Sequence, residues 1–148
     1  MLIDLHRTLD ALLMLQKSDL HGRRITVVRD YAGQLPQIMA VSDQIKQVFL
    51  NLLANAAVAC PQYGGVITVS TREEDDSRVA VAIKDTGMGI KPEDMEQIFQ
   101  PFYSTKGEAK GTGLSLSVSH DIIQAHQGEI RVEGRPGEGA IITVLLPL

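Results

Sequence analysis

The chain has few of the residues that cross-link, charge or anchor a protein. Its 148 residues include one cysteine, Cys60, which excludes an internal disulfide framework and a cysteine-rich zinc site. Lys and Arg number 14 against 18 Asp and Glu, so the basic excess typical of nucleic-acid binders is missing. No segment approaches the roughly 18 consecutive apolar residues of a membrane helix. These absences favour one cytoplasmic domain, residues 1–148, that contacts neither nucleic acid nor membrane.

Three segments have the periodicity of amphipathic helices. Apolar residues recur at helical spacing in residues 4–20, 42–60 and 113–125. Ser42 is suited to cap the second of these helices. Hydrophobic residues make up 44% of the chain, so we expect the fold to be stabilised by packing.

Five runs have the alternation or β-branching of strands. They are residues 25–29, 66–72, 79–84, 129–133 and 140–146. Residues 85–112 are rich in Gly, Lys, Ser and Thr, which predicts loops with one short helix near 92–97. This order of elements predicts an α+β fold: a two-layer α/β sandwich with a mixed, mostly antiparallel sheet and the helices on one face.

The second predicted helix carries a polar stripe. Gln47, Asn51 and Asn55 are spaced four residues apart, so they share one side of the helix. One interpretation is a solvated face. The other is a site in which carboxamide oxygens hold a hard cation such as Mg²⁺, which uses few protein ligands.

Asp85 stands at the end of a predicted strand and is followed by Thr86-Gly87-Met88-Gly89-Ile90. This pattern can be an ordinary turn. Alternatively, a carboxylate held at a strand end can accept a hydrogen bond from an exocyclic amine, and Gly87 and Gly89 let the backbone approach a flat ring.

A second glycine-rich segment, Gly111-Thr112-Gly113-Leu114, opens the third predicted helix. Backbone N–H groups at a helix N-terminus form a ready site for phosphate. The segment matches neither the P-loop nor the dinucleotide-binding motif. Between the two glycine-rich segments, Lys106 follows Ser104 and Thr105 and offers a cation to a phosphate.

Together and in this order, these segments resemble the catalytic ATP-binding domain of sensor histidine kinases. Asn51 and Asn55, then DTGMGI, then IFQPFYSTK, then GTGL resemble the N, G1, F and G2 boxes of the Bergerat (GHKL) ATPase fold. The resemblance covers nearly the whole chain and is nearest to the nitrogen-regulation-like subset. Val58, Ser115 and Ala140 depart from the frequent family residues.

The resemblance implies a site for ATP and Mg²⁺, with Asn51, Asn55 and Lys106 in catalytic roles. Asn55 would coordinate Mg²⁺, Asp85 would accept from the adenine amino group, and Thr143 would support Asp85. Residues 99–112 would form a lid over the phosphates. The full implied set of ATP contacts is Asn51, Asn55, Asp85, Gly87, Gly89, Ile90, Phe102, Thr105, Lys106, Gly111, Thr112, Gly113, Leu114 and Thr143.

The phosphoacceptor of such kinases is a histidine on a dimerisation hairpin, in an H-E/D-x-x-x-P type motif. None of the four histidines of this chain fits that motif, so we expect all of them to be structural. The dimerisation domain is then absent from this chain, which is expected to be a monomer. Its partners would be that domain of the same kinase and a response regulator.

Two other functions compete with the kinase interpretation. One is a GHKL ATPase or a serine kinase of the anti-sigma type, but such proteins typically carry a glutamate at the position of Asn51, and asparagine cannot act as a general base. The other is a non-catalytic nucleotide-binding module, which Val58 and Ser115 leave open.

Overall fold

A sheet and a layer of helices make up the part of the chain that the computed structural model describes, residues 1–60, 64–75, 77–86, 116–134 and 139–148. The main sheet contains β2 (Ile25–Asp30), β4 (Gly65–Glu74), β5 (Arg78–Asp85), β6 (Glu129–Gly134) and β7 (Ala140–Pro147). The strand order is β2-β4-β5-β7-β6. Only β2 and β4 pair in parallel and the other neighbours are antiparallel, which confirms the predicted mixed sheet.

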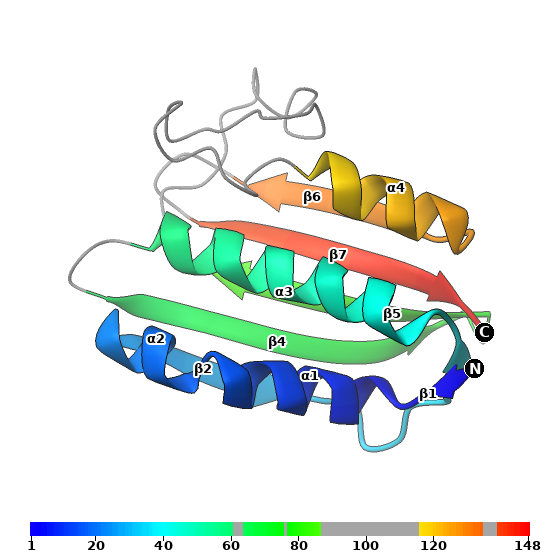
Figure 1. The fold of residues 1–148 in the computed structure, drawn as a ribbon, viewed down its shortest axis with the longest axis horizontal. Helices are drawn as coiled ribbons and strands as arrows, with labels where there is room; N and C mark the ends of the chain where they lie inside the picture. Colours follow the sequence, from blue (N-terminus) through cyan, green and yellow to red (C-terminus); the bar gives the residue numbers. More distant parts are fainter. Residues whose placement is uncertain (61–63, 76, 87–115, 135–138) are drawn as a thin grey trace.

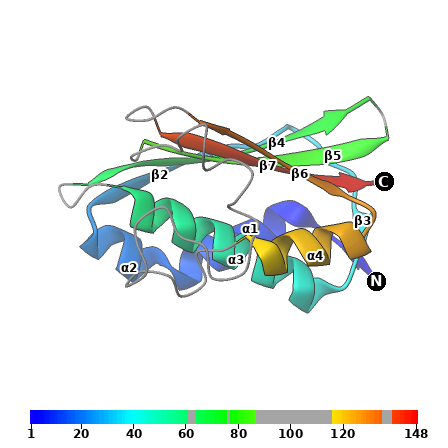
Figure 2. The same cartoon turned by 90° about the horizontal axis from the view of Figure 1, so that it is seen from above.

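The helices lie on one face of this sheet (Figures 1 and 2). They are α1 (Leu5–Leu15), α2 (Lys17–Gly22), α3 (Ser42–Ala59) and α4 (Ser117–Ala125). Side chains alternate along a strand, so Val79, Val81 and Ile83 of β5 all point into the core beneath α3. Phe49 and Leu52 of α3 are fully buried in the same core. This packing confirms the predicted two-layer sandwich.

Three local predictions differ from the structure. Residues 4–20 do not form one helix, because the chain turns at Gln16, the C-cap of α1, before α2 begins. Ser42 does not cap α3; it is the first helical residue and Val41 is the N-cap. A small antiparallel sheet of β1 (Leu2–Ile3) and β3 (Ile38–Met39) was not predicted, since two-residue strands leave no periodic signal. The predicted short helix at 92–97 lies outside the described residues.

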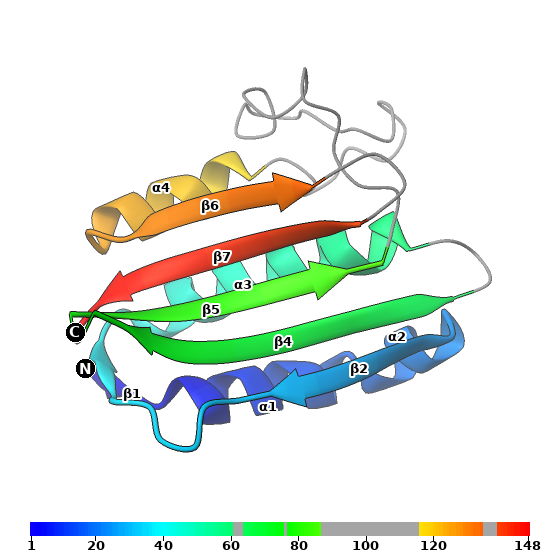
Figure 3. The same ribbon diagram turned by 180° about the vertical axis from the view of Figure 1, so that it is seen from behind.

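The other face of the sheet carries no described helix (Figure 3). Glu74 is joined there to Arg78 at 2.9 Å and to Arg131 at 3.6 Å. The first pair joins the neighbouring strands β4 and β5. The second spans β5 and β7, on the face of the sheet that holds Ala80 and Leu145, both 0% exposed. Long charged side chains therefore cover the apolar centre of this face with their aliphatic stems.

No helix among the described residues is long and apolar enough to cross a membrane.

Candidate functional site

The two asparagines of α3 lie beside its core-facing stripe. Asn51 and Asn55 are half-buried, whereas the neighbouring Leu52 is fully buried. The Oδ1 atom of Asn55 is itself buried. Gln47, one turn earlier in the same stripe, is exposed. Burial therefore increases along the stripe from the exposed Gln47 to the half-buried Asn51 and Asn55.

Asp85 is the last residue of β5 and is only 5% exposed. It follows Ile83 on the face of the sheet that the helices cover, because side chains of alternate residues share a face. On β7 its partner across the strand pair is Ala140, and on β4 its partner is Ile67. The structure thus places a buried carboxylate at the end of a central strand, on the same side of the sheet as Asn51 and Asn55.

Tight packing fixes the end of β5. Gly139 has a φ of +83°, and a Cβ at this position would collide with the Asp85 carbonyl oxygen. On the other side, Thr86 Oγ1 accepts a hydrogen bond from the Val66 N–H at 3.0 Å. A Cβ on Gly65 would approach Thr86 Oγ1 to 2.9 Å. Backbone contacts from both neighbouring strands therefore hold the Asp85-Thr86 segment in place.

A hydrogen bond links α3 to α4 at the asparagine stripe. Asn51 Nδ2 donates to Ser119 Oγ at 3.2 Å. Ser119 is 1% exposed and lies one helical turn before Ile123, which is fully buried. Ser119 was not among the predicted site residues. A serine on the apolar stripe of the third predicted helix was the one sequence signal that could have indicated it.

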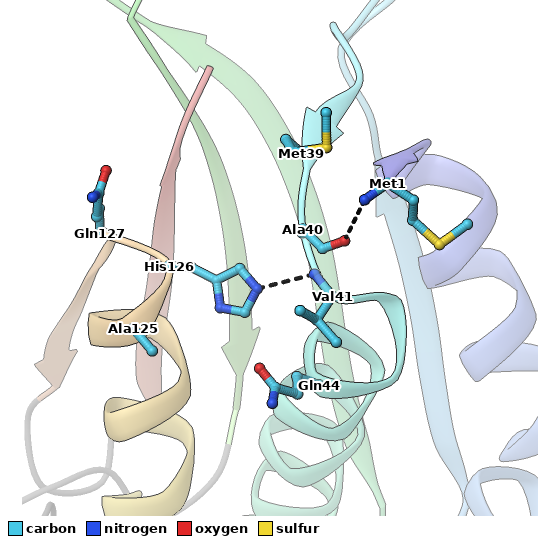
Figure 4. A pocket seen from close by; sticks show the side chains of 8 residues that line it. All are labelled: Met1, Met39, Ala40, Val41, Gln44, Ala125, His126 and Gln127. Carbon is cyan, nitrogen blue, oxygen red and sulfur yellow. Dashed lines mark hydrogen bonds between the residues drawn. The ribbon is translucent and has the colours of Figure 1, made fainter.

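The opposite end of α4 is also held by a side chain. His126, the C-cap residue, interacts through Nδ1 with the Ile122 carbonyl at 2.8 Å, and its Nε2 accepts from the Val41 N–H at 3.1 Å (Figure 4). Val41 is the N-cap of α3, so α3 and α4 run antiparallel between this contact and the one at Asn51. The structural role expected for His126 is confirmed by these contacts.

A surface groove of about 460 Å³ adjoins His126. Its lining is mostly apolar and includes Met39, Val41 and Ala125 (Figure 4). It lies at the start of α3, at the far end of the helix from Asn55. The groove is therefore separate from the asparagines and from Asp85.

The predicted support of Asp85 by Thr143 is wrong. Thr143 pairs with Ala82 on β5 and with Arg131 on β6, three residues along β7 from the partner of Asp85. Paired residues share a face of the sheet, so Thr143 lies on the face opposite the helices. The residue beside Asp85 is Ala140, one of the noted departures from the family pattern.

Most of the predicted nucleotide contacts, at both the adenine and the phosphate end, lie outside the described residues. They are Gly87, Gly89, Ile90, Phe102, Thr105, Lys106, Gly111, Thr112, Gly113 and Leu114, together with the predicted lid, residues 99–112. Within the described residues, no three His, Cys, Asp or Glu side chains gather to hold a metal ion. Asn51 and Asn55 contribute carboxamide oxygens on α3.

Comparison with known proteins identifies the family to which this fold and these residues belong. Residues 40–148 match the family described as histidine kinase-, DNA gyrase B- and HSP90-like ATPase. Over 146 residues the chain is 41% identical to the sensor histidine kinase ZraS of Klebsiella oxytoca, covering 99% of this chain and 31% of ZraS. The chain thus spans about a third of that relative's length.

Solved structures agree with the sequence match. The catalytic domain of histidine kinase ThkA superimposes with a TM-score of 0.88 at 27% identity, covering 99% of this chain and 94% of that one. A structure of ThkA in complex with the response regulator TrrA matches with a TM-score of 0.85 at 26% identity, covering 99% and 41% of the respective chains.

Proposed function

We propose a function for this chain on the basis that it belongs to the histidine kinase-, DNA gyrase B- and HSP90-like ATPase family, as an ATP-binding catalytic domain of the histidine kinase type. The proposed function is to bind ATP with Mg²⁺ and to donate the γ-phosphate to a histidine on a separate dimerisation domain. The observation that carries the proposal is the buried carboxylate of Asp85 on the same side of the sheet as Asn51 and Asn55.

Asp85 binds the adenine end of the nucleotide. Its carboxylate accepts a hydrogen bond from the exocyclic amine, and burial excludes the water that would compete for that bond. Gly139 and Thr86 support this role because they restrict the strand end that carries the carboxylate. Gly87, Gly89 and Ile90 shape the wall against the ring.

Asn51 and Asn55 line the phosphate end. Mg²⁺ prefers oxygen ligands and usually keeps several waters and phosphate oxygens, so one or two carboxamide oxygens suit it. The buried Oδ1 of Asn55 fits such a ligand. When bound, the ion neutralises charge on the phosphates. Lys106 and Thr105 contact the phosphates, Phe102 and Gly111–Leu114 enclose them, and residues 99–112 act as the lid.

The chemistry requires positioning more than proton transfer by this chain. The acceptor imidazole is itself the nucleophile, and the protein aligns it with the γ-phosphate and neutralises charge. Asn51 cannot take a proton from water. This disfavours the alternative of an efficient ATPase, in which a carboxylate at that position would activate water.

The partners follow from the same assignment. The acceptor histidine belongs to a dimerisation domain of the same kinase, because no histidine of this chain occupies an acceptor motif. A response regulator takes the phosphoryl group next, and the solved complex of the kinase ThkA with the response regulator TrrA supports this class of partner. The domain works in the cytoplasm, where ATP is supplied, and is a monomer when isolated.

Calorimetric titration with ADP and ATP, with and without Mg²⁺, tests the proposal. Wild-type chain is expected to bind both nucleotides, and Asp85→Ala to lose binding. Asp30→Ala is the matched control, since Asp30 also ends a strand but is exposed. Absence of binding to wild type at millimolar nucleotide, or binding retained in Asp85→Ala, would refute the adenine assignment.

Phosphotransfer is measured next with a supplied histidine-bearing dimerisation domain and γ-labelled ATP. Label is expected on the histidine and not as free phosphate. Asn51→Glu is expected to raise hydrolysis by introducing a general base. Fast hydrolysis by wild type with no labelled histidine would favour the ATPase alternative, and binding with neither reaction would favour the non-catalytic module.

A further inference from the structure

The inward side of α4 carries Ser119 and Ile123, and with the N-cap residue Leu116 they are 1%, 0% and 2% exposed. Ser119 is the one polar residue of the three. Burying a hydroxyl without a hydrogen bond costs free energy, and an alanine at this position would pack against α3 without that cost. The hydrogen bond that Asn51 Nδ2 donates to Ser119 Oγ at 3.2 Å offsets this cost.

This hydrogen bond fixes the orientation of the Asn51 carboxamide group. A carboxamide has a donor end and an acceptor end, and only the oxygen can serve a cation. Tying Nδ2 to a buried serine turns Oδ1 away from α4. Without the tie, the amide could rotate and present its N–H₂ group to the site instead. Because Ser119 is held within the core, the direction is set before any ligand arrives.

The position of α4 strengthens this constraint. The His126 Nε2 contact to the Val41 N–H holds the far end of α4 against the N-cap of α3. Sliding of α4 along α3 would break this bond together with the one to Asn51. The two contacts thus fix the register in which Ser119 faces Asn51.

We propose that Ser119 is a positioning residue that orients the Asn51 carboxamide so that Oδ1 faces the Mg²⁺ and phosphate end of the nucleotide. This inference rests on the proposed function. It assigns Ser119 no contact with nucleotide; it acts through Asn51.

The readout is the factor by which Mg²⁺ increases affinity for ATP, measured by calorimetry on the full chain. Ser119→Ala is expected to reduce that factor about fivefold, the effect of one net hydrogen bond, and to leave the Mg²⁺-free affinity unchanged. Ser119→Cys fills the same space with a much weaker acceptor and is expected to behave like Ser119→Ala. Thr8→Val is the control, because it removes another buried hydroxyl, which donates to the carbonyl of Asp4, the N-cap of α1.

A double-mutant cycle separates positioning from stability. Asn51→Ala should reduce the Mg²⁺ factor at least as much as Ser119→Ala does, with Asn55 still present, and adding Ser119→Ala should change it no further, since the serine has nothing left to orient. Additive effects, a normal Mg²⁺ factor in Ser119→Ala, or an equal loss in Thr8→Val would each overturn the inference. Failure of the wild-type chain to bind any nucleotide would instead overturn the proposed function.

Discussion

At the level of single residues, Gly139 restricts the position of Asp85, the carboxylate proposed to bind adenine. Two independent constraints act on this glycine: a φ of +83°, and the Asp85 carbonyl oxygen, which occupies the place that a Cβ on Gly139 would take. Other residues adopt such backbone angles at a cost of roughly 1–3 kcal/mol. A glycine here is therefore part of the support for the site, although it need not touch the ligand.

Gly139→Ala is predicted to destabilise the fold and to weaken nucleotide binding together. The strained φ and the collision with Asp85 both act at this position, so the midpoint of thermal unfolding should fall by at least several degrees. Gly22→Ala is the control, because an added methyl there would meet no atom within 4 Å. Thermal unfolding followed by circular dichroism checks the first effect and calorimetry the second. A Gly139→Ala variant with unchanged unfolding and binding would contradict this account.

Among the elements, α4 is bonded to α3 at two places. Its first turns reach Asn51 through Ser119, and its C-cap reaches the N-cap of α3 through His126. The neutral His126 ring can meet both contacts at once: Nδ1–H donates to the Ile122 carbonyl while Nε2 accepts from the Val41 N–H. The histidine thus does more than end its own helix; it sets how α4 lies against α3.

His126→Phe is predicted to lower the free energy of unfolding by about 1–2 kcal/mol, since a ring of similar size remains but both hydrogen bonds are lost. His21→Phe, at an exposed position on α2, should have little effect. Urea denaturation of both variants provides the comparison. Equal losses in the two variants, or none in His126→Phe, would show that the link carries no stability.

For the molecule as a whole, a polar cluster joins the helix layer to the parallel edge of the sheet. The His6 and Tyr31 rings stack with centroids 4.4 Å apart, and the Tyr31 hydroxyl donates to Asp10 Oδ1 at 2.9 Å. His6 Nε2 also lies 2.7 Å from Thr71 Oγ1 on β4. Burial of the phenol, reinforced by the Asp10 carboxylate, raises the pKa of Tyr31 to about 12.

This shifted pKa predicts alkaline behaviour. Because the folded-state pKa lies above the usual value of about 10, the stabilisation is complete below pH ~10 and is lost as the pH rises toward 12. Tyr31→Phe should remove this part of the pH dependence. The difference in phenolate absorbance between wild type and Tyr31→Phe measures the titration directly. A Tyr31 that ionises near pH ~10 in the folded chain would contradict the prediction.

Local sequence signals were sufficient for much of this molecule. Helical and alternating periodicities report which face of an element is buried, and so they located the main strands, α3, the α+β class and the strand end at Asp85. The Asn51 and Asn55 stripe also needed no fold, because residues four apart share a side of any helix.

Contacts between distant segments required the fold itself. The register of β5 against β7 places Ala140, and not Thr143, beside Asp85, and a shift of one residue in such a register moves a side chain to the opposite face. The Asn51 bond to Ser119 joins residues 68 apart, and the His126 bond to Val41 joins residues 85 apart. Periodicity says which side of a helix is buried but not which residue of another helix it will meet. For that reason the chain's own pattern indicated the carboxylate and the carboxamides, while packing between α3, α4 and the sheet determined what holds them.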